Sequence, residues 1–291
     1  MSKIQFEYFA PETIEETVAL LQAHGEGCHV MAGGTDLLVK IQHRVTHPKV
    51  LVGLGKIKEL KRISFSLKSG LTIGAMASLA DVAAHPKIKK HFPSVAHAAA
   101  STANVQVRNK GTVVGNICNA SPSADNIPTL LVLGSRVNIA GPDGETRMPL
   151  ADFFLGPGIS ALKPGQFVTS LNVPVPETHT GTAYLSLSQR GQLDCSAVGV
   201  AAMVVMDKNK CKDARIAVGA CAPIPMRTTA AEKMLIGKPL THKAIEAAAV
   251  RASKETKPIT DVRASAAYRW KMVAVLTIRA LIEAQKNARK Q

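Results

Sequence analysis

Aromatic residues and paired cysteines are both scarce in this sequence. Of its 291 residues only 4% are aromatic, and no stretch interleaves them with basic side chains as a base-stacking platform requires. The five cysteines form no CxxC pair, which argues against a disulfide framework, a zinc finger or a cysteine-ligated iron–sulfur cluster. We expect free thiols in a reducing cytoplasm, and no metal site in this chain.

Long hydrophobic runs are also absent. No run approaches the roughly 20 apolar residues of a membrane-spanning helix, and residues 1–16 show no signal-peptide core. Hydrophobic residues at 46% and charged residues at 20% exclude a mainly disordered chain. We therefore expect two or three compact units, located in the cytoplasm and without a membrane span.

Acidic residues are outnumbered, 21 against 36 lysines and arginines, which gives a formal net charge of +15. This excess permits contact with nucleic acid, an acidic membrane surface, an acidic protein partner or an anionic ligand. Part of it lies in KIKELKR at residues 56–62 and KIKK at residues 87–90. A solvated basic surface is the simplest explanation and an acidic partner the second, whereas nucleic acid is least favoured because stacking aromatics are lacking.

The first half of the chain has a mixed pattern. Apolar residues at Ile14, Val18 and Leu21 predict a helix, and strands are expected at residues 28–32 and 49–54. This alternation indicates a small α/β unit with parallel pairing. Further elements are expected as a helical turn from Asp36, a strand at 71–76, a helix at 79–85 capped by Ser78, a helix at 95–103 and a hairpin turning at 142–144.

The last third changes character. Residues 174–184 are rich in Pro and Thr and are expected to form a connection. Strands are predicted at residues 197–206 and 214–221, and the pattern becomes helical from Thr228 onward. We expect a three-stranded antiparallel sheet with a small helical bundle. In the last helix five residues are expected to share one face: Trp270, Val273, Thr277, Ala280 and Leu281.

Two glycine-bearing stretches are candidate ligand sites. In VMAGGTDLL, residues 30–38, a strand runs into Gly33 and Gly34, where the lack of Cβ atoms lets backbone N–H groups approach phosphate oxygens. Alone, this stretch also fits an ordinary strand–turn–helix, and it matches neither GxGxxG nor the P-loop pattern.

The second stretch, NKGTVVGNICNASPSAD at residues 109–125, again combines small residues with neutral hydrogen-bonding groups. Asp125 is placed to accept a hydrogen bond from a ribose hydroxyl or a ring N–H, although a polar loop with a capping Asp explains the pattern equally well. Two turns suited to binding phosphate oxygens in one chain favour a dinucleotide ligand over a mononucleotide. The candidate ligand groups here are Gly111, Thr112, Gly115, Asn116, Ser121 and Ser123.

Taken together, these motifs resemble those of the FAD-binding subunits of the xanthine dehydrogenase family of molybdenum hydroxylases. That group includes the medium subunits of carbon monoxide dehydrogenase and the FAD subunits of nicotinate dehydrogenase. The resemblance rests on AGGTDLL and TVVGNICNASPSAD, and it extends in order over nearly the whole chain through FAP at 9–11, LTIGAM at 71–76, QVRNKGT at 106–112, RIAVGACAPIPMR at 215–227 and DVRASAAYRWKM at 261–272.

The resemblance implies an α+β fold with an α/β N-terminal part, the FAD-binding fold of the vanillyl-alcohol oxidase (PCMH) type. Two FAD-binding subdomains, residues 1–58 and 59–176, would hold the flavin between them. A C-terminal subdomain with the three-stranded sheet and helices, residues 177–291, would cover it.

The resemblance also implies which residues bind FAD. One loop would wrap the pyrophosphate, a second would clamp it, Asp125 would fix the adenosine or ribitol side, Ala103 would lie along the cofactor, and Val168 would contact the flavin ring through its main chain. The first loop comprises Val30, Met31, Ala32, Gly33, Gly34, Thr35, Asp36 and Leu37, and the second comprises Thr112, Val113, Val114, Gly115 and Asn116.

Three positions stand out against the family pattern. Val114 replaces the first glycine of the usual TIGGN or TVGGN, and Ser186 stands where relatives often have a lysine near the flavin. Asp194 matches the aspartate of an RxxxD pattern that begins at Arg190, and we expect a structural role for it.

By resemblance, the chain is an FAD-carrying electron-transfer subunit. A large molybdopterin subunit would oxidise the substrate, and a small subunit with 2Fe–2S clusters would deliver electrons to FAD, which passes them to NAD⁺ or another acceptor. No catalytic acid or base is assigned in this chain. The alternatives are a self-sufficient FAD oxidoreductase and, from another class, a basic nucleic-acid-binding or scaffold protein.

Overall fold

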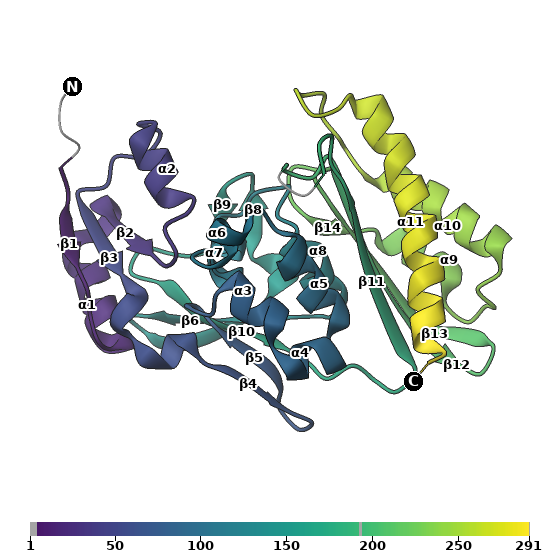
Figure 1. Ribbon diagram of the computed structural model, residues 1–291, viewed down its shortest axis with the longest axis horizontal. Helices are drawn as coiled ribbons and strands as arrows, with labels where there is room; N and C mark the ends of the chain where they lie inside the picture. The colour runs from purple at the N-terminus through teal and green to yellow at the C-terminus, as the bar shows by residue number, and fades with distance from the viewer. Residues whose placement is uncertain (1–4, 192–193, 291) are drawn as a thin grey trace.

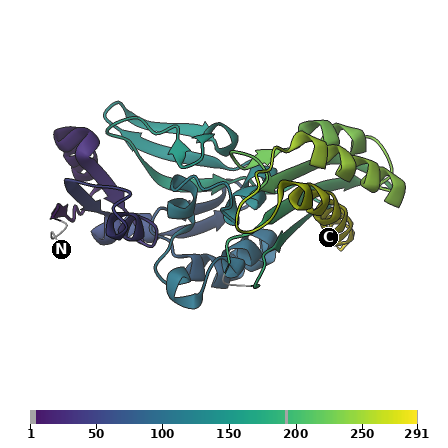
Figure 2. The ribbon, with the colours of Figure 1, turned by 90° about the horizontal axis from the view of Figure 1, so that it is seen from above.

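The computed structural model describes residues 5–191 and 194–290, which form three units in a row along the long axis of the molecule (Figure 1). Each unit is built around its own sheet. The view from above shows the same order, with the N-terminal unit at one end and the C-terminal helices at the other (Figure 2). No helix among the described residues is long and apolar enough to cross a membrane.

The first unit contains a parallel sheet in the order β1-β3-β2, which confirms the parallel pairing that the sequence predicts. Parallel strands need a crossover, and α1 (Ile14–His24) supplies one between β1 and β2. Thr13 caps this helix, because its Oγ1 accepts a hydrogen bond from the Glu16 amide at 3.1 Å. The other elements are β1 (Glu7–Phe9), β2 (Cys28–Met31), α2 (Leu37–Gln42), β3 (Val50–Gly53) and the 3₁₀ turns η1 (Gly25–Gly27), η2 (Leu54–Lys56) and η3 (Lys58–Lys61).

The second unit is an antiparallel five-stranded sheet with helices packed beside it. Its strand order is β4-β5-β10-β6-β7, from β4 (Ile63–Ser66), β5 (Gly70–Gly74), β10 (Phe167–Val173), β6 (Arg136–Gly141) and β7 (Gly144–Pro149). The predicted hairpin is the β6–β7 pair. The remaining elements are α3 (Leu79–Ala84), α4 (Pro86–His91), α5 (Pro93–Ser101), α6 (Val105–Arg108), α7 (Val113–Cys118), α8 (Asn126–Val132), η4 (Leu150–Asp152), β8 (Phe154–Gly156) and β9 (Ile159–Ser160).

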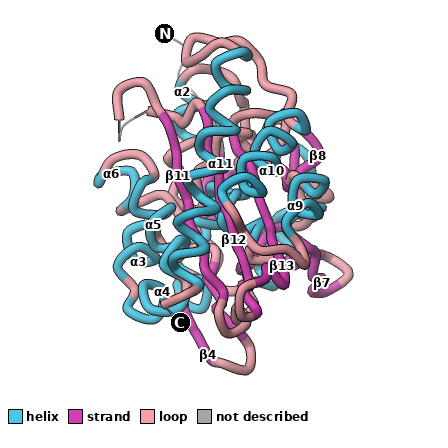
Figure 3. Tube along the Cα trace, turned by 90° about the vertical axis from the view of Figure 1, so that its right-hand side faces the viewer, coloured by secondary structure: helices cyan, strands magenta, loops and turns pink. Residues whose placement is uncertain are grey.

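The third unit is an antiparallel sheet in the order β11-β12-β13-β14, with α9, α10 and α11 on one face (Figure 3). The predicted three strands are one too few, because the two-residue β14 is too short to leave a sequence pattern. The expected connection at residues 174–184 is also too long, since β11 begins at Thr180. The elements are β11 (Thr180–Leu187), β12 (Val198–Asp207), β13 (Lys210–Gly219), β14 (Met226–Arg227), α9 (Thr229–Leu235), α10 (His242–Glu255) and α11 (Ala266–Ala288).

Both faces of β12 are covered, which explains its unbroken apolar sequence. Successive residues of a strand point to opposite faces. Met203 and Val205 belong to a core shared with the second unit, whereas Val204 and Met206 pack in a separate core under α11. On the first of these faces α8 packs against β12 and β13, so the second and third units meet there.

Trp270 is the exception on the predicted buried face of α11. The side chains of Val273, Thr277, Ala280 and Leu281 are fully buried, whereas Trp270 is 51% exposed. Its indole nitrogen donates a hydrogen bond to the Thr256 carbonyl at 3.4 Å. Trp270 therefore lies at the edge of the bundle, where a tryptophan can keep its N–H near a partner.

Candidate FAD site

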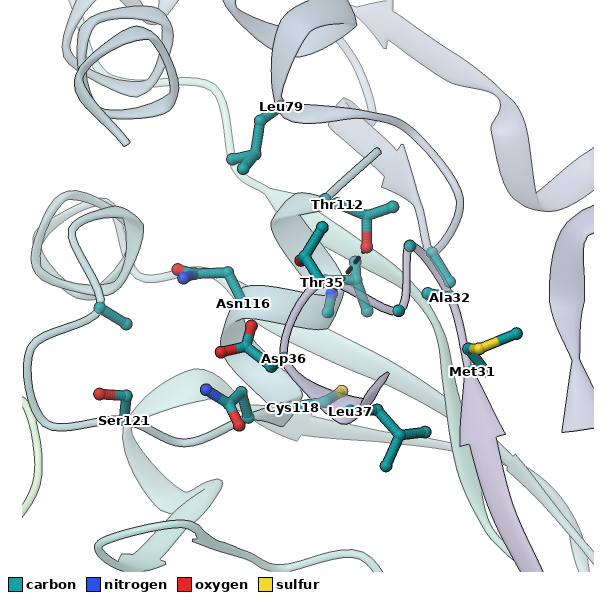
Figure 4. A pocket seen from close by; sticks show the side chains of 18 of the residues that line it. Met31, Ala32, Thr35, Asp36, Leu37, Leu79, Thr112, Asn116, Cys118 and Ser121 are labelled. Carbon is teal, nitrogen blue, oxygen red and sulfur yellow. Dashed lines mark hydrogen bonds between the residues drawn. The ribbon is translucent and has the colours of Figure 1, made fainter. Parts of the chain in front are cut away.

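A cavity of about 440 Å³ lies where the three units meet. Its walls come from the loop after β2, the segment from α6 to α8, the start of β10 and the segment before β12. Figure 4 shows part of this lining, with the side chains of Thr35, Asp36, Asn116 and Ser121 drawn around the opening.

The first glycine turn packs its bare backbone onto the second. A Cβ atom on Gly33 would overlap the carbonyl oxygen of Lys110 and lie 2.6 Å from its carbonyl carbon and 2.9 Å from the Gly111 Cα. Ordinary carbon contacts are about 3.5–4.0 Å, so only glycine fits at this position. The next residue, Gly34, has φ of 72°, in the left-handed region that favours glycine. The two turns thus form one continuous wall of the cavity.

The second turn is held by the cap of a short helix. Thr112 is the N-cap residue of α7, and its Oγ1 accepts a hydrogen bond from the Gly115 amide at 2.9 Å (Figure 4). The Asn116 side-chain oxygen accepts a hydrogen bond from Asn126 Nδ2 at 3.1 Å. The backbone of the turn and the Asn116 amide are therefore fixed before any ligand arrives.

Replacing Thr112 with valine preserves its shape and removes the capping oxygen. We expect the cap loss to cost about 1 kcal/mol and to weaken FAD binding about fivefold, because the Gly115 amide loses its acceptor. Fluorescence titration of FAD into the cofactor-free variant measures this effect. Thr146→Val, on the exposed strand β7, is the matched control. An unchanged affinity in Thr112→Val would contradict this role for the cap.

Side-chain hydrogen bonds between and within the first two units also brace the cavity. Lys40 Nζ, from α2, donates a hydrogen bond to Asn119 Oδ1 at 2.6 Å, at the end of α7. Arg108 donates to the carbonyls of Thr102 and Ala103 at 3.0 and 2.6 Å. These bonds hold Ala103 in its unusual conformation, with φ of 46°, at the cavity wall.

Asp125 places a carboxylate in the wall next to the third unit. Its Oδ1 accepts hydrogen bonds from Tyr184 Oη at 2.7 Å and from Ser196 Oγ at 2.6 Å. Burial raises the pKa of Asp125, and the two hydrogen bonds act in the opposite direction. Burial, followed by the charge of Asp125, also raises the pKa of Tyr184, so its hydroxyl remains a proton donor.

The far end of the cavity is more apolar. Phe167 and Val168 line it at the start of β10, together with Leu162 from the loop before that strand, and Val168 is 3% exposed. The pairing of β10 with β6 shifts register directly after Val168, a bulge that changes how the backbone presents itself there. This end offers apolar side chains to a ligand, as a planar ring would need.

The structure brings the predicted site residues together with one exception. Fifteen of the sixteen line the cavity, whereas Val113 is fully buried and does not line it. Val114 is 2% exposed and joins the core while bordering the cavity, so a valine is accommodated at the glycine position of the family pattern. Contact of these residues with FAD stays a prediction.

Several lining residues were not predicted. Ser121 and Ser123 stood out as hydrogen-bonding groups in the second motif, and Asn119 lies in the same motif without having been singled out, but the others lie in segments with no motif. Their place depends on how distant strands pair, so sequence reasoning had no signal for them. The additional lining residues include Lys40, Thr102, Asn119, Leu162, Gln166, Phe167 and Cys195.

Ser186 and Asp194, the other two positions that stand out against the family pattern, differ in whether they line the cavity. Ser186 is exposed on β11, opposite Gly199 of β12, and does not line the cavity. Asp194 does line it, and it accepts hydrogen bonds from the Arg190 amide and from its Nε, both at 3.0 Å. The hydrogen bond from the Arg190 side chain lowers the pKa of Asp194. Arg190 thus pairs with Asp194 at the cavity, in agreement with the expected structural role.

The chemistry of the lining fits FAD. Bare backbone at Gly33 and Gly34 suits phosphate oxygens, a carboxylate at Asp125 suits a sugar or polyol hydroxyl, and the apolar end suits the ring. Among the described residues, no group of three His, Cys, Asp or Glu side chains is placed to hold a metal ion.

Comparison with known proteins places the chain in a family. Residues 4–176 match the FAD binding domain in molybdopterin dehydrogenase, and residues 183–284 match the CO dehydrogenase flavoprotein C-terminal domain. The carbon monoxide dehydrogenase medium chain of Hydrogenophaga pseudoflava is 32% identical over 277 residues, 95% of this chain and 96% of that protein. The nicotinate dehydrogenase FAD-subunit of Eubacterium barkeri is 33% identical over 247 residues, 83% of each chain.

A solved structure gives the same result for the fold. Carbon monoxide dehydrogenase from Hydrogenophaga pseudoflava, in a form that lacks the Mo-pyranopterin moiety of its molybdenum cofactor, matches with a TM-score of 0.95 and 33% identity over 99% of both chains. The predicted FAD-binding fold of the PCMH type is confirmed. The chain therefore belongs to the xanthine dehydrogenase and carbon monoxide dehydrogenase family of molybdenum hydroxylases, as an FAD-binding (medium) subunit.

Proposed function

We propose that this chain holds FAD in the cavity and passes electrons from the 2Fe–2S clusters of a small partner subunit to NAD⁺ or another acceptor. A large molybdopterin subunit would oxidise the substrate. The observation that carries the proposal is the contact of Gly33 with the Lys110–Gly111 backbone, which joins both glycine turns into one wall of the cavity.

In this proposal each part of the wall has a task. Residues 30–37, Thr112 and residues 114–116 present main-chain groups to the pyrophosphate, and Asp125 accepts a hydrogen bond from a hydroxyl of the cofactor. Ala103 lies along the cofactor, and the main chain at Val168 lies beside the ring. FAD itself supplies the redox chemistry when bound, and this chain binds it, orients it and sets its surroundings.

The proposed electron path is tested with the assembled complex. The tagged chain is purified under native conditions with its associated subunits, and a portion is depleted of FAD. Both portions are reduced anaerobically with limiting dithionite and mixed with NAD⁺ or a short-chain quinone. We expect the iron–sulfur absorbance to recover at least about tenfold more slowly without FAD, because the path to the acceptor then lacks its last carrier.

Equal rates with and without FAD would overturn the electron path. Oxidation of aldehydes or purines by the isolated FAD-loaded chain would instead favour the self-sufficient oxidoreductase. Salt-sensitive binding of DNA by a colourless protein would favour the nucleic-acid-binding alternative.

A further inference from the structure

Three hydrogen bonds tie the third unit to the turn that carries Asp125. Tyr184 and Ser196 both donate to Asp125 Oδ1, at 2.7 and 2.6 Å. Beside them, the Ala220 amide donates to the Pro122 carbonyl at 2.6 Å. The link joins distant parts of the sequence, and its Asp125 lines the cavity.

Only one of the two carboxylate oxygens of Asp125 accepts hydrogen bonds from the described residues. Both donors reach Oδ1, whereas Oδ2 accepts no hydrogen bond from the described residues. An ionised carboxylate can accept about four hydrogen bonds on its two oxygens, so Oδ2 is still able to accept hydrogen bonds from a ligand. Both donors are neutral hydroxyls and leave the negative charge of Asp125 uncancelled. A purely structural link has no need of a free acceptor at the cavity, but a ligand site does.

The two donors are themselves held in place. Tyr184 is 3% exposed on β11, and Gly199 of the neighbouring strand leaves room for its hydroxyl, because a Cβ there would lie 3.0 Å from it. Ser196 is 5% exposed. The next carbonyl, of Ala197, accepts a hydrogen bond at 2.8 Å from the buried guanidinium of Arg269.

Arg269 anchors this segment to the rest of the third unit. Its Nη1 also donates to the Ala220 carbonyl at 2.6 Å, and its Nη2 donates to Asp261 at 2.6 Å. One buried side chain on α11 thus fixes the backbone next to Ser196 and at Ala220, whose amide holds Pro122. The direction of the Asp125 carboxylate is therefore set by the third unit.

We propose that Tyr184 and Ser196 are positioning residues for the cofactor, which hold one oxygen of Asp125 so that the other accepts a hydrogen bond from a sugar or polyol hydroxyl of FAD. This inference rests on the proposed binding of FAD in the cavity. Through these two hydroxyls, the packing of the third unit against the second determines how tightly the cofactor is held.

The test is a double-mutant cycle on FAD affinity, measured by fluorescence titration of the full-length protein after removal of its cofactor. We expect Tyr184→Phe and Ser196→Ala each to weaken binding about five- to twentyfold, since each removes a hydrogen bond to a charged group. Ser196→Thr keeps the hydroxyl and is expected to restore affinity to within about twofold. Tyr268→Phe, on an exposed side chain of α11, is the matched control.

The decisive measurement repeats Ser196→Ala in an Asp125→Ala background, which removes both the charge and the oxygen that accepts the Ser196 hydrogen bond. If Ser196 acts through the carboxylate, the substitution changes affinity there by less than about twofold. An equal loss in both backgrounds would overturn the inference, as would wild-type affinity in Tyr184→Phe and Ser196→Ala. A wild-type protein that binds no FAD would instead overturn the proposed function itself, so the two failures are distinguishable.

Discussion

Replacement of Gly33 by alanine is expected to weaken FAD binding at least about 100-fold. The added Cβ would overlap the Lys110 carbonyl oxygen, which belongs to the backbone and cannot rotate away as a flexible side chain can. Overpacking of this kind costs about 3 kcal/mol, and that cost falls on the contact that joins the two glycine turns. FAD retained after gel filtration, followed by titration of the stripped protein, measures the loss.

Gly55→Ala is the matched control, because a Cβ at that position has no neighbour within 4 Å and its φ is not in the left-handed region. Gly55→Ala should bind FAD as the wild type does. Wild-type affinity in Gly33→Ala would contradict the account of the cavity wall.

Replacement of Gly181 by alanine is expected to destabilise the third unit by about 3 kcal/mol or more. Gly181 lies on β11 where α11 crosses it, and a Cβ there would overlap the Ala284 carbonyl oxygen and the Ala288 amide. Neither group belongs to a side chain, so the helix itself must shift. Asn287 Nδ2 donates to the Thr182 carbonyl at 3.0 Å and is expected to lose this bond.

Urea denaturation followed by far-ultraviolet circular dichroism measures the change, with Gly55→Ala again as control. We expect a lower midpoint for Gly181→Ala, and weaker FAD binding only as a consequence of that instability. An unchanged midpoint would show that α11 moves away from β11 at little cost, contrary to the close packing described above.

Local features of the fold were predictable because their causes are local. Ser78 accepts a hydrogen bond from the Asp81 amide at the start of α3, as its sequence context indicates. The left-handed conformation of Gly34 is likewise local, whereas the neighbour that requires glycine at position 33 is the distant Lys110 backbone, which the sequence did not indicate. The family resemblance, carried by the same motifs, then indicated both the cofactor and the chain segments that surround it.

The features that could not be predicted from the sequence depend on contacts between residues far apart in the chain. Asp125 accepts hydrogen bonds from Tyr184 and Ser196, which lie 59 and 71 residues further along the chain. No sequence pattern near any of the three residues predicts this contact. Strand β10 enters the sheet between β5 and β6, which brings Phe167 to the cavity. The exposure of Trp270 follows from where the bundle ends, a property of three helices together.

The most direct test of the account is the FAD content of the tagged chain purified under native conditions. The measurement combines the flavin absorbance band with chromatography of the cofactor released by heat, and protein is quantified in the same sample. The account predicts about one FAD per chain, retained by the wild type and by Gly55→Ala and lost by Gly33→Ala. A colourless wild-type protein that takes up no added FAD would contradict it.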